Sequence, residues 1–254
     1  MYRVTLRFYE ELNDFLPTAM RKRDFSYEFQ GRRSVKDLIE SMGVPHVEVD
    51  MIMVNGAPEG FDYIVGDGDR LSVYPVFERF DIAGVTRARA APLREPRFVA
   101  DVHLRKLARR LRLLGFDVDF SEGRDDPELA DISRREGRVL LSRDRQLFMR
   151  RRVERGLVVR STDPDEQLRE VLDRLQIYSL CRPFTRCIQC NGPMRELVFG
   201  GAEFMFRRGD IPKGVLAWCR EFFVCDGCSK IYWKGSHYEK LLSLVESVLG
   251  ENGQ

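Results

Sequence analysis

Two Cys-x-x-Cys pairs constrain the C-terminal part of this chain more strongly than any other feature. Cys187 and Cys190 form the first pair, and Cys225 and Cys228 form the second. Each pair can supply two thiolates from one tight turn, and two such turns complete the tetrahedral site that structural zinc prefers. Because all four ligands would be thiolates, the pattern predicts a closed structural zinc site rather than a catalytic one.

The segment between the two pairs is longer than that of a minimal zinc finger and suits a ribbon, with strands predicted at GAEFMF and EFFVC. Gly192 and Gly227 stand where the cysteine turns need conformational freedom. Cys181 and Cys219 fall outside the spacing, and we interpret them as small buried residues. The N-terminus is charged and alternating, without the pattern of an export signal. We therefore expect a reducing cytoplasm, with bound metal rather than disulfides.

Three apolar runs in the middle of the chain each lead to an aspartate. The runs FVA, RVLLS and LVVRS lead to Asp101, Asp144 and Asp163. Segments with helical periodicity lie between the runs, and this alternation predicts a largely parallel sheet. Because the C-terminal ends of parallel strands share one edge, these carboxylates are expected to converge there. Magnesium or manganese held among them would offset their mutual repulsion and activate a water for attack on a phosphodiester.

Helix capping is the competing interpretation for some of these acids. Asp126 and Asp163 each precede a proline, so each could be no more than the N-cap of the helix that follows. Asp125 stands beside Asp126, and either of the two could be a metal ligand. For Asp101 and Asp144 capping explains less, and we interpret both as ligands. The arginine-rich helix that follows Asp144 is expected to stop at Gly156.

Residues 1–82 follow a different order of elements. Alternating apolar residues predict two strands at 2–9 and 24–30. A helix capped by Ser34 follows, then a strand that runs into an Asn55-Gly56 turn, and then a last strand. Two strands, a helix and two further strands indicate a small α+β domain of the β-grasp type.

Composition adds limits but no function. The formal net charge is +2, with 43% hydrophobic and 32% charged residues, as in an ordinary globular protein. Acidic residues prevail in the first domain, which makes it a poor binder of nucleic acid, and the remainder is mildly basic. No apolar run approaches the roughly 18 residues that cross a membrane. Residues 83–95 are interpreted as a linker, followed by an α/β domain at 96–178 and a zinc ribbon with a C-terminal helix at 179–254.

Several of these segments resemble a known family. FVADVHLRKLARRLRLLGFDV, the pair Asp125-Asp126, RVLLSRDRQL and the later Gln167-Leu168 resemble the Mut-seven C-terminal RNase domain, a member of the PIN-like nucleases. The resemblance covers about residues 96 to 245 and includes the YWKGSH stretch after the second cysteine pair. It implies a PIN-like fold in which strand-end acids bind a divalent metal. Matched by position, these acids are Asp101 and Asp144, with Asp125 or Asp126 and Asp163 as further candidates.

The first domain resembles the ubiquitin-like sulfur carriers of thiamine and molybdopterin synthesis, and more closely the ubiquitin-like domain fused to the same RNase family. The sulfur carriers act through a free C-terminal Gly-Gly, whereas this chain continues after Tyr74-Pro75 without a glycine pair. A sulfur-carrier function therefore ranks last. We interpret the domain as a docking or regulatory module with a protein partner.

Basic and aromatic residues are the candidates for binding substrate. Four arginines would neutralise backbone phosphates, and Ser142 would keep a hydroxyl at the end of its strand. Trp233 and His237, with the neighbouring Tyr232 and Lys234, combine stacking surface with charge and would suit single-stranded nucleic acid. In the other interpretation Tyr232 and Trp233 seal the ribbon onto the α/β core, and Ser236 caps the last helix. The candidate substrate residues are Arg105, Arg109, Arg143, Arg145, Ser142, Trp233 and His237.

The sequence thus predicts an α/β protein: a PIN-like parallel sheet with helices and a zinc ribbon, preceded by a β-grasp domain. The predicted function is that of a ribonuclease that depends on magnesium or manganese and hydrolyses RNA, expected to be single-stranded. The alternative is a non-catalytic RNA- or ribosome-associated adaptor with a structural zinc ribbon.

Overall fold

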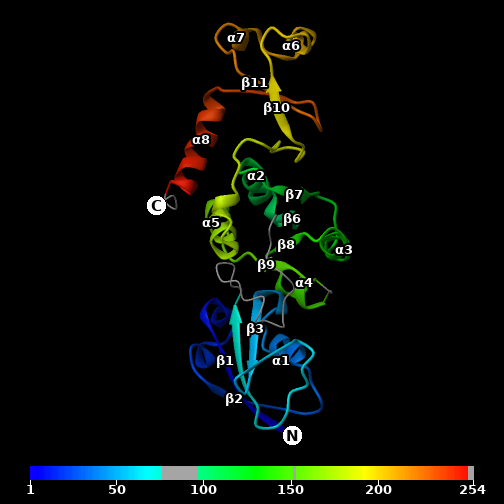
Figure 1. The fold of residues 1–254 in the computed structure, drawn as a ribbon, viewed down its shortest axis with the longest axis vertical. Coiled ribbons are helices and arrows are strands. Elements are labelled where there is room, and N and C mark those ends of the chain that lie inside the picture. Colours follow the sequence, from blue (N-terminus) through cyan, green and yellow to red (C-terminus); the bar gives the residue numbers. More distant parts are fainter. Residues whose placement is uncertain (76–95, 151–152, 251–254) are drawn as a thin grey trace.

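The computed structural model describes residues 1–75, 96–150 and 153–250. Three parts are stacked along the long axis, with the N-terminal sheet at one end and the cysteine-bearing ribbon at the other (Figure 1). The predicted linker at 83–95 lies outside the described residues, so the domain boundaries that flank it stay predictions. No helix in the described part of the chain is long and apolar enough to cross a membrane.

The N-terminal domain contains a five-stranded sheet in the order β2-β1-β5-β3-β4. The central pair, β1 and β5, is parallel, and the other neighbours are antiparallel. This is the β-grasp arrangement that the sequence predicted. Its elements are β1 (Tyr2–Phe8), β2 (Phe25–Phe29), α1 (Val35–Ser41), β3 (Val49–Val54), β4 (Ala57–Glu59) and β5 (Arg70–Pro75).

Local sequence explains these elements. Val4, Leu6 and Phe8 of β1 are buried, because alternate side chains of a strand point to the same face of a sheet. The Ser34 side chain forms a capping box with Asp37 at the start of α1. Asn55 and Gly56 both have positive φ angles, 52° and 86°, between β3 and β4, as a two-residue hairpin turn requires.

The second sheet has four parallel strands in the order β7-β6-β8-β9. In Figure 1, α5 lies on one side of this sheet and α3 on the other. Side chains from α2 and α5 pack in one buried cluster with Phe98 and Leu141, whereas those from α3 join Val99 and Leu140 in another. The elements are β6 (Arg97–Ala100), α2 (Arg105–Leu113), β7 (Asp117–Phe120), α3 (Asp126–Glu136), β8 (Val139–Ser142), α4 (Arg145–Arg150), β9 (Gly156–Val158) and α5 (Pro164–Leu175).

Two local predictions in this domain were wrong. The N-cap of α3 is Asp125, whose carboxylate accepts a hydrogen bond from the amide of Glu128, and Asp126 is already helical. Gly156 does not end α4 but begins β9. A Cβ atom at Gly156 would lie 2.4 Å from a ring carbon of Phe148, so this glycine lets the buried phenylalanine pack directly on the strand.

The C-terminal ribbon is a three-stranded antiparallel sheet in the order β10-β11-β12. The predicted strand EFFVC is confirmed as β11, but GAEFMF forms helix α6, because Phe204 alone of its large residues enters the ribbon's core while Met205 and Phe206 are exposed. The last helix begins at Ser236 with no side-chain cap, so the predicted Ser236 cap is absent. The elements are β10 (Met194–Leu197), α6 (Ala202–Arg207), α7 (Lys213–Leu216), β11 (Phe222–Cys225), β12 (Ile231–Trp233) and α8 (Ser236–Leu249).

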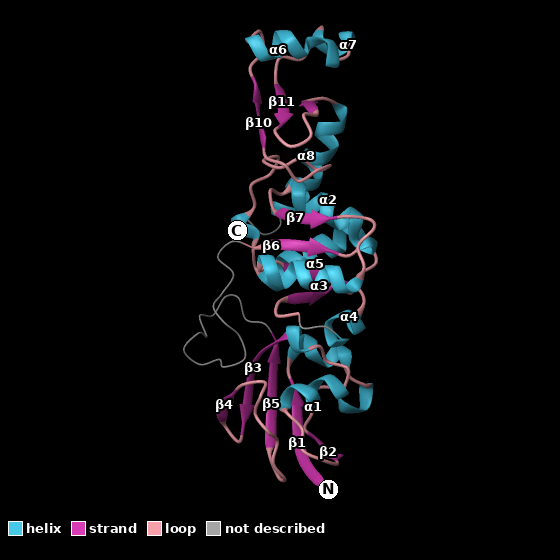
Figure 2. Ribbon diagram, turned by 90° about the vertical axis from the view of Figure 1, so that its right-hand side faces the viewer, coloured by secondary structure: helices cyan, strands magenta, loops and turns pink. Residues whose placement is uncertain are grey.

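Helix α8 connects the ribbon to the middle of the molecule. Val245 and Val248 join the buried cluster formed by α2 and α5. Figure 2 shows the two sheets of the N-terminal and middle domains one above the other. Short 3-10 helices complete the chain: η1 (Glu10–Phe15), η2 (Thr18–Met20), η3 (His46–Glu48), η4 (Val102–Leu104), η5 (Tyr178–Leu180) and η6 (Arg208–Asp210).

Candidate functional site

The predicted acids follow neighbouring strands of the parallel sheet. Asp101 follows β6 directly, and Asp144 comes two residues after the end of β8. Since β6 and β8 are parallel neighbours, their C-terminal ends meet at one edge, where open α/β sheets bind ligands. Asp101 is buried, whereas Asp144 is exposed. The edge therefore offers one carboxylate beneath the surface and one at the surface.

Ser142 joins these two acids. Its hydroxyl donates a hydrogen bond to Oδ2 of Asp101 at 2.7 Å and accepts one from the backbone amide of Asp144 at 3.0 Å. The serine is fully buried, so its hydroxyl has no competing water and holds both residues in a fixed relation. Oδ1 of Asp144 accepts a bond from the amide of Gln146, which leaves one oxygen of each carboxylate outside these bonds.

The other candidate acids are engaged as helix caps or lie on a helix surface. Oδ1 of Asp163 accepts hydrogen bonds from the amides of Asp165 and Glu166, and these bonds lower the pKa of Asp163 below its usual value. Asp125 caps α3, and Asp126 is exposed in its first turn. The capping interpretation thus describes Asp163 and Asp125. It also describes Asp144, contrary to the expectation from the sequence, because Asp144 precedes the first residue of α4 and its carboxylate accepts from the amide of Gln146. The metal role of these acids stays a prediction.

The acids do not form a tight group. In the described residues, four cysteines are the sole set of three or more potential metal-binding side chains whose ligand atoms lie within 4.8 Å of one another. Ser142 connects the carboxylate of Asp101 to the backbone amide of Asp144. A site at this edge would hold a metal through two side chains and water.

The candidate arginines are distributed around this edge and along α2. Arg105 pairs with Glu122 at 2.7 Å, and both side chains are more than half exposed. Arg109 reaches the side chain of Gln189 in the first cysteine turn at 3.4 Å. Arg143 is exposed beside Asp144, whereas the guanidinium of Arg145 lies 4.8 Å from the ring centre of Phe15 in the N-terminal domain. Arg145 is therefore also a contact between domains.

The two Cys-x-x-Cys pairs meet as predicted. The sulfur atoms of Cys187 and Cys228 are 3.7 Å apart, and those of Cys190 and Cys225 are 3.3 Å apart. Four thiolates around one zinc at about 2.3 Å would be separated by about 3.8 Å, so the set is close to the size of a zinc site. Cys181 and Cys219 are buried in apolar clusters away from this set, as predicted.

The surroundings of the four sulfurs suit metal-bound thiolates. Backbone amides of Gly192 and Gly227 point at Cys190 and Cys225 at 3.4 and 3.3 Å. A Cβ atom at Gly192 would lie 2.9 Å from the sulfur of Cys225, so the glycine allows the two turns to approach. Burial raises the pKa of the other three thiols, whereas at Cys187 hydrogen bonds from the Tyr232 hydroxyl and backbone amides outweigh burial and lower the pKa to about 7.

Two residues that the sequence analysis missed attach the first cysteine turn to the middle domain. Arg112 of α2 is buried and donates to the carbonyl oxygens of Gln189 and Val118 at 2.9 and 2.8 Å. Asn191 accepts from the amide of Val118 and donates to Asp117 on the edge strand β7. The sequence contained one signal for this role of Arg112: it stands between leucines in α2, and a cation on the apolar face of a helix needs hydrogen-bond acceptors.

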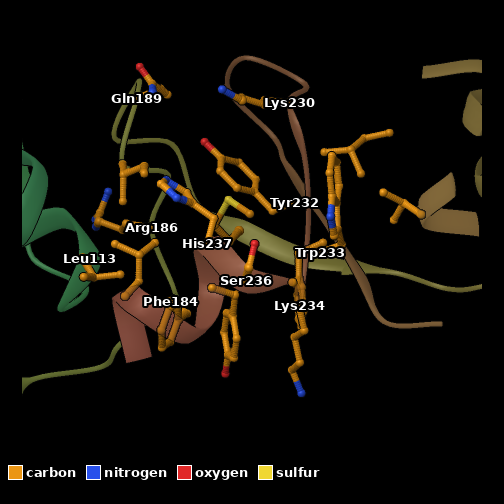
Figure 3. A pocket seen from close by; sticks show the side chains of 18 of the residues that line it. Leu113, Phe184, Arg186, Gln189, Lys230, Tyr232, Trp233, Lys234, Ser236 and His237 are labelled. Atoms are coloured by element: carbon orange, nitrogen blue, oxygen red, sulfur yellow. The ribbon is translucent and has the colours of Figure 1, made fainter. Parts of the chain in front are cut away.

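Trp233 and His237 lie together at a cavity of about 580 Å³ between the ribbon, α2 and the start of α8. Figure 3 shows Tyr232 in the middle of this cavity, with Leu113, Phe184 and Arg186 on one side and Trp233 and Lys234 on the other. Trp233 also packs against the buried cluster of the ribbon. Tyr232 and Trp233 both line the cavity, and the cluster against which Trp233 packs belongs to the ribbon itself rather than to the α/β core.

These parts together define a class of protein: a β-grasp domain, a parallel α/β sheet with acids at its C-terminal edge, and a four-cysteine ribbon. Family comparisons match residues 96–245 to the Mut7-C RNAse domain and residues 1–81 to the Mut7-C ubiquitin domain. The chain belongs to the Mut7-C RNase family and carries the family's ubiquitin-like domain before it. The resemblance and the fold class expected from the sequence are confirmed.

Individual proteins add little to the family match. No curated protein matches the chain. Among solved structures, a Pyrococcus furiosus protein described as molybdopterin converting factor, subunit 1, matches at 21% identity with a TM-score of 0.25. That match covers 30% of this chain and 100% of the other.

Proposed function

We propose that this protein is a metal-dependent ribonuclease whose active site is the edge of the parallel sheet at Asp101 and Asp144. The observation that carries the proposal is the bonded series Asp101, Ser142 and Asp144 in a domain of the Mut7-C RNAse family. The two carboxylates stand at the C-terminal ends of neighbouring parallel strands and supply oxygen ligands of the kind that a divalent cation uses.

The residues at this edge fit a hard divalent cation. Each of the two carboxylates has an oxygen that takes part in none of the hydrogen bonds or ion pairs among described residues, and both are oxygen donors of the kind magnesium and manganese accept. Asp125 or Asp126 and Asp163 are further candidates in this proposal. Bound there, such an ion would supply a water of lowered pKa and neutralise charge on the reacting phosphate.

The protein's own residues would hold the substrate and the ligands in place. Ser142 fixes the orientation of Asp101 and the backbone of Asp144. Arg143 and Arg105 are exposed next to this edge and would pair with backbone phosphates of RNA, which gives affinity without base preference. Arg109 extends this positive surface along α2.

The four-cysteine set would hold one structural zinc. Its sulfur separations and amide contacts fit four thiolate ligands, and four such ligands would leave no coordination position on zinc for a reacting water. We assign it to keeping the two turns of the ribbon in place against α2 and β7 rather than to catalysis.

Single substitutions of the acids test the ribonuclease proposal. Asp101→Asn and Asp144→Asn should each abolish manganese-dependent cleavage of single-stranded RNA while circular dichroism stays unchanged. Asp131→Asn, on the exposed surface of α3, is the matched control and should retain activity. Full activity in both site variants would overturn the assignment of the metal site.

A second candidate is supported by one observation. Within the described residues the acids form no group tight enough to bind metal through three ligands, and Asp163, Asp125 and Asp144 already serve as caps. An RNA- or ribosome-associated adaptor without catalysis would show this geometry. It predicts RNA binding that is equal with and without manganese and no cleavage by the unaltered protein.

A further inference from the structure

We propose that the cavity between the ribbon and α8 is a binding site for an unstacked base of single-stranded RNA, separate from the acids. This inference rests on the proposed ribonuclease function for its ligand class. Its evidence is a separate set of residues, which we call the aromatic pocket. The pocket is defined by Trp218, Trp233, Tyr232, Tyr238, Phe184 and Phe223 with their neighbours.

The walls of the aromatic pocket suit the flat faces of a base. Six aromatic side chains and several aliphatic ones line a cavity of about 580 Å³. Both tryptophans of the chain are among them, and Trp218 is 56% exposed although it is a large apolar residue. Stacking on aromatic rings is the general way in which proteins bind bases without reading their sequence.

Charge favours an anionic ligand over an apolar peptide. Four side chains of the lining can carry positive charge, Arg186, Lys230, Lys234 and His237, and no acid belongs to the lining. Arg186 is bonded within the cysteine turn and Lys234 pairs with Glu221. Lys230 and His237 are exposed and form no ion pair with another described residue. A phosphate beside a stacked base could pair with Lys230.

The pocket is connected to the acids by the basic face of α2. Arg105 and Arg109 are four residues apart and therefore lie on one side of the helix. Arg105 is near the Asp101 end of α2, Arg109 contacts Gln189 in the lining, and Leu113 at the other end of the helix lines the cavity. The helix is about 14 Å long at 1.5 Å per residue. A single strand of about four stacked nucleotides would cover this length.

Tryptophan fluorescence reports directly on this site because both tryptophans line it. The full-length Asp144→Asn protein, which should not cleave, is titrated with an oligoadenylate, with an abasic oligomer of equal phosphate number, and with adenosine monophosphate. We expect saturable quenching by the oligoadenylate, little by the abasic oligomer, and weaker binding of the monophosphate because it cannot reach Arg105 and Arg109.

Variants locate the binding. Trp218→Ala, which leaves Trp233 as the reporter, should weaken oligoadenylate binding by at least about fivefold. Lys230→Ala should also weaken oligoadenylate binding, and it tests the pocket if Trp218→Ala does not fold. Lys240→Ala, an exposed lysine of α8 outside the pocket, is the control and should bind normally.

The outcomes separate this inference from the proposed function. Equal quenching by the abasic oligomer, equal affinity for the monophosphate, or no effect of both pocket variants would overturn the pocket while leaving cleavage untouched. No quenching by any nucleotide would also overturn it and would leave the pocket to a protein partner. Quenching of the Asp144→Asn protein as expected, together with no cleavage of RNA by the unaltered protein in the presence of manganese, would support the pocket and refute the ribonuclease.

Discussion

Glu48 of the ubiquitin-like domain forms an ion pair with Arg174 of α5 in the RNase domain. The glutamate is fully buried, and it also accepts a hydrogen bond from the amide of Val158 at 2.7 Å. Arg174 donates to the carbonyl oxygen of the same Val158. The two side chains therefore satisfy the amide and the carbonyl of Val158 on β9, which is an edge strand, and the ubiquitin-like domain covers that edge at this residue.

Removal of this glutamate should be costly. Glu48→Ala leaves the largely buried Arg174 with only Glu170, at 3.6 Å, as its anion and leaves the amide of Val158 without its acceptor. The free energy of unfolding should therefore fall by about 3 kcal/mol. Chemical denaturation measures the change. Asp14→Ala is the matched control, because Asp14 pairs with Arg160 at the same interface but is more than half exposed, and it should cost no more than about 1 kcal/mol. Equal losses in the two variants would show that the buried pair does not stabilise the contact.

The Ser142 hydroxyl should matter for activity as well as for stability, because its loss leaves the buried carboxylate of Asp101 without this hydrogen bond. Ser142→Ala removes the bond to Asp101 and the acceptor for the amide of Asp144, and loss of such a supporting bond typically lowers activity by about 10- to 100-fold. Ser142→Thr keeps the hydroxyl and should retain most of the activity. Initial rates of RNA cleavage over a manganese titration distinguish the two, and an Ala variant as active as the Thr variant would show that the bond has no role.

Metal analysis tests the ribbon. The purified chain should contain about one zinc per molecule, as four thiolates imply. Cys190→Ser should lower that content and loosen the ribbon, seen as faster proteolysis between β10 and β11. Cys219→Ser changes a buried cysteine outside the set and should leave the zinc content unchanged. A folded Cys190 variant with full zinc would contradict the site.

Acid stability depends on Asp117, which attaches β7 to the first cysteine turn. Burial would raise the pKa of Asp117, but hydrogen bonds from Arg138 and Asn191 outweigh it and hold the pKa below the usual 3.8. A carboxyl with a lowered folded pKa stabilises the fold above its unfolded pKa of about 3.9, and this stabilisation is lost as the pH falls through the folded value.

Asp117→Asn should therefore lower the Tm at pH 7, and the difference from the unaltered protein should shrink as the pH falls below about 4. Asp131→Asn changes an exposed carboxylate of α3 and should show no such convergence. Thermal melts between pH 2.5 and 7 measure both. A Tm difference for Asp117→Asn that stays constant over this range would exclude the ionised pair as its cause.

Sequence alone determined much of this protein because the relevant signals are local. Alternation in β1, the capping box at Ser34 and the Asn55-Gly56 turn each specify their own segment. The four cysteine ligands follow from spacing, since a Cys-x-x-Cys turn presents both sulfurs whatever surrounds it. The order of apolar runs was also enough to place Asp101 and Asp144 at one edge of a parallel sheet.

Local signals failed where packing decided between alternatives. GAEFMF has the composition of a strand but forms α6, and Gly156 resembles a helix stop but belongs to β9 because Phe148 packs on it. Asp125 rather than Asp126 caps α3. The position of Pro127 is compatible with an N-cap at either residue, so the proline alone does not distinguish them. In each case the competing local conformations differ by less free energy than tertiary contacts supply.

Only the tertiary structure revealed how the parts are joined. The Glu48 and Arg174 pair, the Asn191 and Asp117 bond, and the aromatic pocket each connect segments far apart in the chain. A sequence can show that Glu48 interrupts an apolar stretch and that Arg112 interrupts a run of leucines. It does not show which groups pair with or hydrogen-bond to these charged side chains. That choice depends on the packing of whole domains, because a buried charge is stable only where distant backbone and side-chain groups bond to it.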